Sequence, residues 1–254
     1  MEEIKKVEPT IEVVEPTIEL IEPEVESGKI IVVEGACDGM GKTTQVLLLD
    51  KKLEADGKKI CRHHFPSYKT FHGELVVRYL EGELGNPAQL SPYLINSLYA
   101  VDRAIAWNKY LREQWEAGKV ILLDRYTTSS LIYQSALITD IEAKKAFIDY
   151  VCEFEYEKLG IGRPNDVIFL HAPFDLVTEM RNARKQNDGV ANDIHESDLE
   201  YMKRVYESAM FVADYLGWSA VRCDKDGKMR GIEDIHDDVY KLVKKKLINN
   251  KKYH

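Results

Sequence analysis

Short apolar runs alternate with longer amphipathic segments through most of the chain. Each run is only four to six residues long, which favours a buried strand over a buried helix. The runs cover residues 29–34, 59–63, 120–123, 167–170 and 219–223. The segments between them have the pattern of helices, which we expect at residues 42–55, 92–117, 127–137, 141–158, 174–184, 197–215 and 232–248.

Strands that alternate with helices predict a parallel sheet with helices on both faces. Residues 28–254 are therefore expected to form one α/β domain, a three-layer α/β/α sandwich around a five-stranded parallel sheet. Sheets of this kind bind ligands at the carboxyl ends of their strands. Polar residues that follow the predicted strands are thus the first candidates for function.

Residues 1–27 follow a different pattern, in which a proline returns every seven residues, at Pro9, Pro16 and Pro23. Proline removes a backbone donor and clashes with the preceding helical turn, so a continuous helix or coiled coil is disfavoured. We expect a disordered acidic tail that acts as a solvated tether. An arm that binds an unknown partner stays open as an alternative, because each repeat also carries aliphatic residues.

The negative charge of the chain is concentrated in this tail. The net charge is −8, and the nine glutamates and two lysines of residues 1–27 account for −7 of it. The remaining body is close to neutral, so a local basic pocket for an anion is unopposed by the overall field. No apolar run approaches the roughly 20 residues of a membrane span, so we expect no membrane partner. We expect no nucleic acid partner either.

The four cysteines and the N-terminus bear on location. Cys37, Cys61, Cys152 and Cys223 are isolated from one another, and no pair has the spacing of a metal clip. The N-terminus is charged and lacks the apolar core of a secretory signal. A reduced, cytoplasmic protein is the simplest interpretation.

A glycine-rich segment follows the first predicted strand and opens the first predicted helix. Backbone N–H groups in such a turn hold phosphate oxygens, while Lys42 would reach the outer phosphates and the Thr43 hydroxyl would bind Mg²⁺. This predicts a P-loop NTPase fold that binds ATP. A glycine-rich turn without a ligand is the alternative. The predicted nucleotide-binding residues are Gly35, Ala36, Cys37, Asp38, Gly39, Met40, Gly41, Lys42, Thr43 and Thr44.

The match to the phosphate-loop pattern has one irregularity. Gly41 is the second glycine of the pattern, so the first should stand at position 36, where the chain has alanine. Gly35 lies one step too early, as though one residue were inserted ahead of Asp38. We expect this insertion to alter the position of the Asp38 carboxylate.

Asp124 ends the strand predicted at 120–123. In P-loop proteins an acidic residue at the end of a neighbouring strand helps to hold the magnesium ion. A helix-capping aspartate is the alternative. Together with the phosphate loop, the position favours Thr43 and Asp124 as the residues that hold Mg²⁺.

Three clusters of side chains are suited to a second anion. Tyr99 and Arg103 lie four residues apart on one helix face, where the ring could stack on a base and the guanidinium could bind a phosphate. A core tyrosine beside a surface arginine is the alternative. Arg125 directly follows Asp124 and precedes Ser129, Ser130 and Tyr133. Arg181 and Arg184 precede a polar loop, which predicts a basic lid over about residues 181–196; a solvated basic helix end is the alternative.

The body resembles the thymidylate kinase family from about Gly28 to the C-terminus. The resemblance rests on the phosphate loop, on Phe65-Pro66, on Leu98-Tyr99-Ala100-Val101-Asp102-Arg103, on Asp124-Arg125-Tyr126 with Ser129, on Tyr133-Gln134 and on Glu155-Lys158-Leu159-Gly160. One departure is His64, which stands where the family usually has an arginine.

The resemblance implies a role for each candidate residue. Asp38 would contact the sugar 3′-hydroxyl of dTMP, Arg103 and Arg125 would hold its 5′-phosphate, and Tyr99 would stack on thymine. Phe65, Ser129, Ser130 and Tyr133 would line the base and sugar pocket. The implied catalytic residues are Lys42, Asp38, Arg125, Arg181 and Arg184. Family members are usually homodimers, which the helix predicted at 92–117 could join.

The implied reaction is transfer of the γ-phosphoryl group of Mg-ATP to dTMP, which gives ADP and dTDP in dTTP synthesis. A deoxynucleoside kinase is the nearest alternative, but its acceptor is a neutral hydroxyl and would not need both Arg103 and Arg125. A nucleotide-binding regulator without turnover is another. The sequence has no Asn-Lys-x-Asp motif for guanine, which disfavours a GTPase switch.

Overall fold

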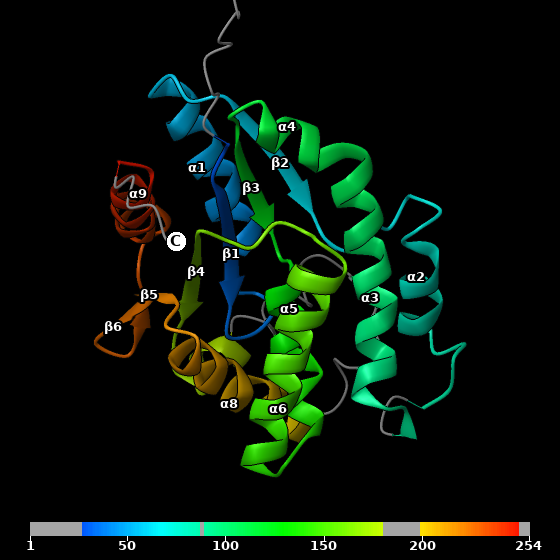
Figure 1. Cartoon of the computed structure of the whole chain (residues 1–254). Coiled ribbons are helices and arrows are strands. Elements are labelled where there is room, and N and C mark those ends of the chain that lie inside the picture. Colours follow the sequence, from blue (N-terminus) through cyan, green and yellow to red (C-terminus); the bar gives the residue numbers. More distant parts are fainter. Residues whose placement is uncertain (1–26, 87–88, 180–198, 249–254) are drawn as a thin grey trace, which may run out of the picture.

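A five-stranded parallel sheet forms the centre of the protein (Figure 1). The computed structural model describes residues 27–86, 89–179 and 199–248. All of the predicted tail except residue 27, and all of the predicted lid, therefore lie outside the described residues. The strands are β1 (Ile30–Gly35), β2 (Ile60–His64), β3 (Val120–Asp124), β4 (Asp166–His171) and β5 (Ser219–Arg222), in the order β2-β3-β1-β4-β5. The predicted five-stranded parallel sheet is therefore confirmed, with β1 in the middle.

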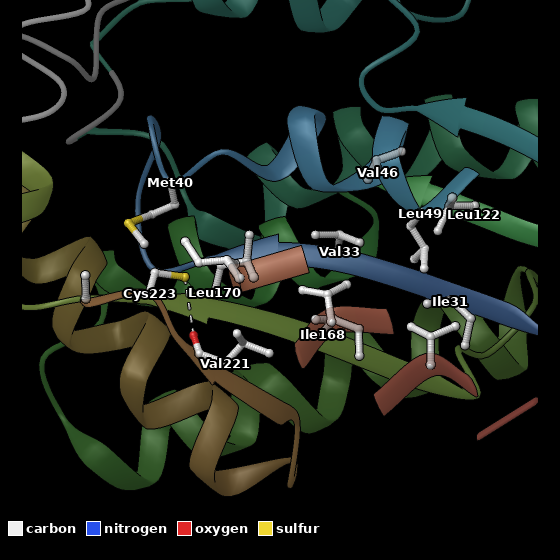
Figure 2. Close-up of a cluster of buried hydrophobic side chains, with 14 of the residues drawn as sticks. Ile31, Val33, Met40, Val46, Leu49, Leu122, Ile168, Leu170, Val221 and Cys223 are labelled. Atoms are coloured by element: carbon white, nitrogen blue, oxygen red, sulfur yellow. Dashed lines mark hydrogen bonds between the residues drawn. The ribbon is translucent and has the colours of Figure 1, made fainter. Parts of the chain in front are cut away.

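Helices cover both faces of the sheet because successive side chains of each strand point to opposite sides. Ile31 and Val33 of β1 pack on one face with α1 (Lys42–Ala55) and α9 (Ile232–Ile248). Figure 2 shows this cluster, in which Val46 and Leu49 of α1 belong to the same apolar layer as the strand residues Leu122, Ile168 and Leu170. Ile30 and Val32 point to the opposite face, against the helix that begins at Pro92. The result is the three-layer sandwich that the alternation predicts.

The helix predicted at 92–117 begins as expected but is not continuous. Ser91 caps α3 (Pro92–Ala106) through its side-chain oxygen, which accepts a hydrogen bond from the Tyr93 backbone N–H at 3.3 Å. A π-helical segment (Trp107–Leu111) and α4 (Arg112–Glu116) follow. The wider π turn places both Trp107 and Leu111 in the core.

The helix predicted at 141–158 is divided in the same way. It consists of α6 (Ile141–Cys152) and a π-helical segment (Glu153–Lys158). This second π segment carries Glu155, which is completely buried and faces the helix α3. π turns often mark functional sites, and this second segment reaches the candidate site through the contact of Glu155 with Arg103.

The remaining helices lie near the carboxyl ends of the strands or beyond them. They include α5 (Thr127–Tyr133), a 3₁₀ turn (Ser135–Leu137) and α8 (Leu199–Tyr215). Residues 174–179 are helical, as expected for the start of the helix predicted at 174–184, whose remainder lies outside the described residues. Two elements were not predicted: α2 (Glu74–Leu80) and the hairpin of β6 (Asp224–Lys225) and β7 (Lys228–Met229). Within the described residues, every helix is too short or too polar to span a membrane.

Candidate active site

The inserted residue of the phosphate loop is accommodated at the end of β1. The strand runs through Gly35, which pairs with Leu170 of β4, and the Ala36 backbone N–H still donates to the Leu170 carbonyl at 2.9 Å. The turn itself begins later, and both Gly39 (φ 91°) and Gly41 (φ 79°) adopt the left-handed conformation that favours glycine. The chain thus uses the additional residue to lengthen the strand before the turn.

This loop forms one wall of a cleft of about 590 Å³, the phosphate-loop cleft. Lys42 is 6% exposed, and its ammonium donates to the Cys37 carbonyl at 3.1 Å and to the Asp38 carboxylate at 3.0 Å. Of the ten predicted nucleotide-binding residues, Gly35, Ala36 and Cys37 do not line the cleft. Its lining consists of residues 38–45 together with His64, Tyr68, Asp124, Arg125, Met229, Arg230, Ile232 and Ile235.

Asp124 lies at the end of β3 with one oxygen paired and the other unpaired. Its Oδ2 accepts a hydrogen bond from the Thr43 hydroxyl at 2.6 Å and lies 3.2 Å from His64 Nδ1. Its Oδ1 is buried without a hydrogen-bond partner among the described residues. Burial alone would raise the pKa of this carboxyl, but the hydrogen bonds from His64 and Thr43 hold the pKa below its usual value. An ionised carboxylate beside a hydroxyl is a donor set that suits Mg²⁺.

A second cleft, the aromatic cleft, opens beside the first between α3, α5 and the loop after β2. All eight residues that the family resemblance assigns to dTMP line it. Its lining is Asp38, Phe65, Pro66, Tyr68, Leu80, Tyr99, Asp102, Arg103, Arg125, Tyr126, Ser129, Ser130, Tyr133 and Gln134.

Three residues line both clefts: Asp38, Tyr68 and Arg125. The Asp38 carboxylate accepts hydrogen bonds from Lys42, from the Arg125 guanidinium and from the Tyr133 hydroxyl, the last at 3.0 Å. The insertion therefore leaves Asp38 inside the site, where one carboxylate offsets the charge of two cations. Burial raises the pKa of Tyr133, which keeps its hydroxyl protonated as a donor.

The backbone holds Arg125 in an unusual conformation. Its φ of 63° lies in the left-handed region, which costs a non-glycine residue about 1–3 kcal/mol. The side chain is held at 3.3 Å from the Ser129 hydroxyl and lies over the Tyr133 ring at 5.6 Å. Strain of this kind persists mainly where function requires a fixed geometry.

Arg103 is arranged differently from Arg125. It is 2% exposed and pairs in bidentate fashion with Glu155, at 2.6 Å from Nε and 2.7 Å from Nη2. Its Nη2 also donates to the Ser130 hydroxyl at 2.8 Å. Burial alone would lower the pKa of Arg103, but Glu155 holds it above its usual value, so the guanidinium stays charged. Arg103 lines only the aromatic cleft, with its charge already compensated.

Sequence reasoning gave no role to several residues that shape this site. Tyr68 lines both clefts, and Arg230 lines the phosphate-loop cleft while pairing with Asp234 and Asp238, each at 2.7 Å.

Glu34 is buried beneath the loop and accepts hydrogen bonds from the hydroxyls of Thr128 and Ser129. Glu155 does stand in a motif of the family resemblance, which was the available signal for it, and Glu34 directly precedes the phosphate loop.

A buried pair also supports the loop after β2. Asp102 accepts a hydrogen bond from the Ser67 backbone N–H at 2.9 Å, and His72 Nδ1 lies 2.6 Å from its other oxygen. Both Asp102 and His72 are almost fully buried. The pair thereby ties the loop that carries Phe65 and Tyr68 to α3.

The predicted lid residues Arg181 and Arg184 lie outside the described residues. All other predicted site residues are described, and most of them meet at the carboxyl ends of β1, β2 and β3. The two clefts therefore offer a phosphate-binding loop, a candidate metal site and an aromatic pocket that share a polar boundary.

Comparison with known proteins gives one consistent result. A family model described as thymidylate kinase matches residues 33–238. A thymidylate kinase of Mycobacterium tuberculosis is 32% identical over 177 residues, which cover 69% of this chain and 81% of that protein. One of Exiguobacterium sp. is 29% identical over 214 residues, covering 84% and 92%. The structure of the thymidylate kinase from Candida albicans matches with a TM-score of 0.63 at 19% identity, covering 86% and 92%, a likeness of fold.

Proposed function

The chain belongs to the thymidylate kinase family, and from that premise we propose that its two clefts transfer the γ-phosphoryl group of ATP to dTMP, giving ADP and dTDP. The observation that carries the proposal is the boundary between the clefts. Asp38, Tyr68 and Arg125 line both, so a nucleotide in each cleft would bring its phosphates to the same place. Direct transfer requires this proximity.

ATP occupies the phosphate-loop cleft in this proposal. The backbone N–H groups of the turn and the start of α1 cradle its phosphates, and Lys42 binds the outer ones. Thr43 and Asp124 would hold Mg²⁺, and the unpaired, buried Oδ1 of Asp124 supports that assignment. When bound, the ion would offset charge on the transferring group.

dTMP occupies the aromatic cleft. Arg125 would bind its 5′-phosphate, because this guanidinium also lines the phosphate-loop cleft. Tyr99 and Phe65 would enclose thymine, while Asp38 and Tyr133 would contact the sugar. Ser129, Ser130 and Arg103 complete the lining, and the pairing of Arg103 with Glu155 makes it a fixed donor at the base of the cleft.

The reaction needs little covalent help from the protein. A phosphate oxygen of dTMP is already a nucleophile, so the site has to align two anions and offset their charge. Lys42 and Arg125 both donate hydrogen bonds to the Asp38 carboxylate. As phosphates enter, these cations turn to them, and the Asp38 carboxylate becomes available to the sugar hydroxyl. Arg181 and Arg184 would bring further positive charge from the predicted lid.

The setting of the enzyme is also part of the proposal. We place it in the cytoplasm as a homodimer without a nucleic acid partner. Exposed apolar side chains on α3 support a dimer contact there, namely Tyr93, Leu94 and Val101. Burial of such a face in a second copy would stabilise the pair.

A coupled assay of ADP release against a panel of acceptors tests the function. dTMP should give turnover, and thymidine, which lacks the 5′-phosphate, should give none above background. Turnover on thymidine instead of dTMP would indicate a deoxynucleoside kinase. ATP binding without acceptor-dependent ADP release would indicate a regulator without turnover. Either result would refute the proposal.

A further inference from the structure

A third cleft, of about 480 Å³, lies at the end of the sheet opposite the active site. It opens beside the first residue of β1, whereas the phosphate loop follows the last, and the six residues of β1 separate the two by roughly 20 Å. Two tryptophans line it, Trp107 and Trp115, with ring centroids 5.9 Å apart. We call it the tryptophan cleft.

The lining of the tryptophan cleft is basic as well as aromatic. Lys29, Arg112 and Arg163 contribute positive charge, and Glu116 is the one acidic residue of the described lining. Arg163 is 57% exposed at the rim, where its Nη2 donates to the Glu157 carboxylate at 3.0 Å, and a carboxylate of a docked segment would share or replace that contact. Trp107 is only 2% exposed, and its indole N–H has no acceptor among the described residues. An aromatic cleft with arginines at its rim suits an acidic, proline-containing segment, because proline packs on indole rings and guanidinium groups pair with carboxylates.

The described chain begins inside this cleft. Ser27 and Gly28 belong to its lining, and the Gly28 backbone N–H donates to the Trp115 carbonyl at 2.7 Å. A side chain on Gly28 would collide with the Lys119 carbonyl, at 1.8 Å from a Cβ. The point at which residues 1–26 join the body is therefore held against Trp115.

The segment that joins here has the chemistry the cleft would select. Residues 1–26 carry nine glutamates against two lysines, and Pro9, Pro16 and Pro23 recur within acidic repeats. The last repeat, residues 21–26, directly precedes the cleft and reads Ile-Glu-Pro-Glu-Val-Glu. A segment tethered beside its site has an effective concentration in the millimolar range, so even a weak contact would be populated.

We propose that the tryptophan cleft binds the acidic proline repeats of the chain's own N-terminal segment, residues 1–26. Glutamates of the repeats pair with Arg112 and Arg163, and a proline packs on Trp115. Docking at this end of the sheet holds seven net negative charges away from the clefts that bind anionic nucleotides. The proposal depends on neither the catalytic assignment nor its residues.

Nuclear magnetic resonance of the full-length ¹⁵N-labelled protein tests this directly, because the chain has only three tryptophans. Trp115 lines the cleft, whereas Trp218 does not and packs instead near Phe169 at 5.8 Å. Replacing the nine tail glutamates by glutamine should shift the Trp115 indole resonance and leave that of Trp218 in place. Raising the salt concentration from about 0.05 M to about 0.5 M should abolish the difference in the Trp115 resonance between the parent and the tail variant. At the higher concentration, charges attract each other only within a few ångströms.

Variants of the cleft supply the matched comparison. In Arg163→Glu, and more strongly in Arg112→Glu/Arg163→Glu, the tail substitutions should no longer shift Trp115, as expected for coupled sites. Lys145→Glu, on α6 and away from the cleft, should preserve the shift in full. Far-UV circular dichroism and a thermal unfolding midpoint like those of the parent would verify that each variant is folded.

Three results would overturn the proposal. The first is a Trp115 resonance that is indifferent to the tail substitutions, and the second is an equal shift of Trp218. The third is a shift that appears only as the protein concentration is raised, because the occupant would then be the tail of a second copy.

Discussion

The phosphate-loop cleft and the aromatic cleft adjoin each other, yet they are built from the sequence in opposite ways. Residues 38–45, one continuous segment, make half of the phosphate-loop lining. The aromatic cleft gathers side chains from the loop after β2, from α2, α3 and α5, and from the phosphate loop. One cleft is therefore mainly local, and the other depends on contacts between distant segments.

The difference appears in how each cleft holds its cations. Lys42 pairs with Asp38, only four residues away. Arg103 pairs with Glu155, 52 residues away and completely buried. A local pair forms whenever the turn forms, but the buried pair requires α3 and the π segment to be docked. We therefore expect changes in the aromatic cleft to affect stability, and changes in the phosphate loop to affect turnover.

The largest expected effect is on the buried pair. Glu155→Gln leaves the Arg103 charge buried without its counter-charge, which should lower the free energy of unfolding by about 3–5 kcal/mol. Urea denaturation measures this change. Glu157→Gln is the matched control, because Glu157 pairs with Arg163 at the surface and its loss should cost less than about 1 kcal/mol. Equal losses in both variants would remove the contrast between the two kinds of pair.

Lys42→Met tests the local cleft. Turnover should fall roughly 10²–10³-fold, because the variant lacks a cation aimed at the transferring phosphates. The KM for dTMP should change little, and stability should be close to that of the parent. Initial-rate kinetics measure both constants, with Lys51→Met on the exposed side of α1 as the control. A change confined to the KM for dTMP would reassign Lys42 to the acceptor.

Arg125→Gln tests the boundary between the clefts. The kcat/KM for dTMP should fall roughly 10²-fold, as expected for loss of a charge-assisted contact of about 3 kcal/mol with a phosphate. ATP affinity, measured by calorimetry without dTMP, should fall much less. Arg78→Gln, an exposed arginine of α2 with two ion pairs, is the control. Equal losses of ATP and dTMP binding would contradict the proposed role.

The smallest effect concerns the support of the loop after β2. His72→Gln weakens the contact with Asp102, which should raise the KM for dTMP about fivefold, the equivalent of one hydrogen bond of about 1 kcal/mol. Turnover at saturation and the KM for ATP should stay near parent values. His171→Gln, outside both clefts, should leave all three constants unchanged. An effect on turnover alone would show that His72 does not act through the dTMP cleft.

The same contrast explains what the sequence could predict. The helices predicted at 42–55 and 232–248 coincide with α1 and with the described part of α9. The eight residues expected to bind the acceptor all line the aromatic cleft. The π segments were missed because they depend on packing: Trp107 and Leu111 enter the core together, and Glu155 turns to meet Arg103.

The phosphate loop is the clearest local signal in the sequence, yet its match to the pattern is irregular at Ala36. The extra residue was expected to disturb Asp38, but β1 takes it up at Ala36, and Asp38 contacts Lys42 and Tyr133. A strand can lengthen by one residue only if its neighbour has a partner for it, here the Leu170 carbonyl of β4. That partner is 134 residues away, so no local pattern reveals it.

Initial rates over a grid of ATP and dTMP concentrations test the central claim most directly. Because Asp38, Tyr68 and Arg125 line both clefts, both nucleotides should be bound together when the phosphoryl group moves. Double-reciprocal plots should then intersect, as for a ternary complex. Parallel lines, the signature of a covalent phosphoenzyme formed before dTMP binds, would contradict direct transfer between the two clefts.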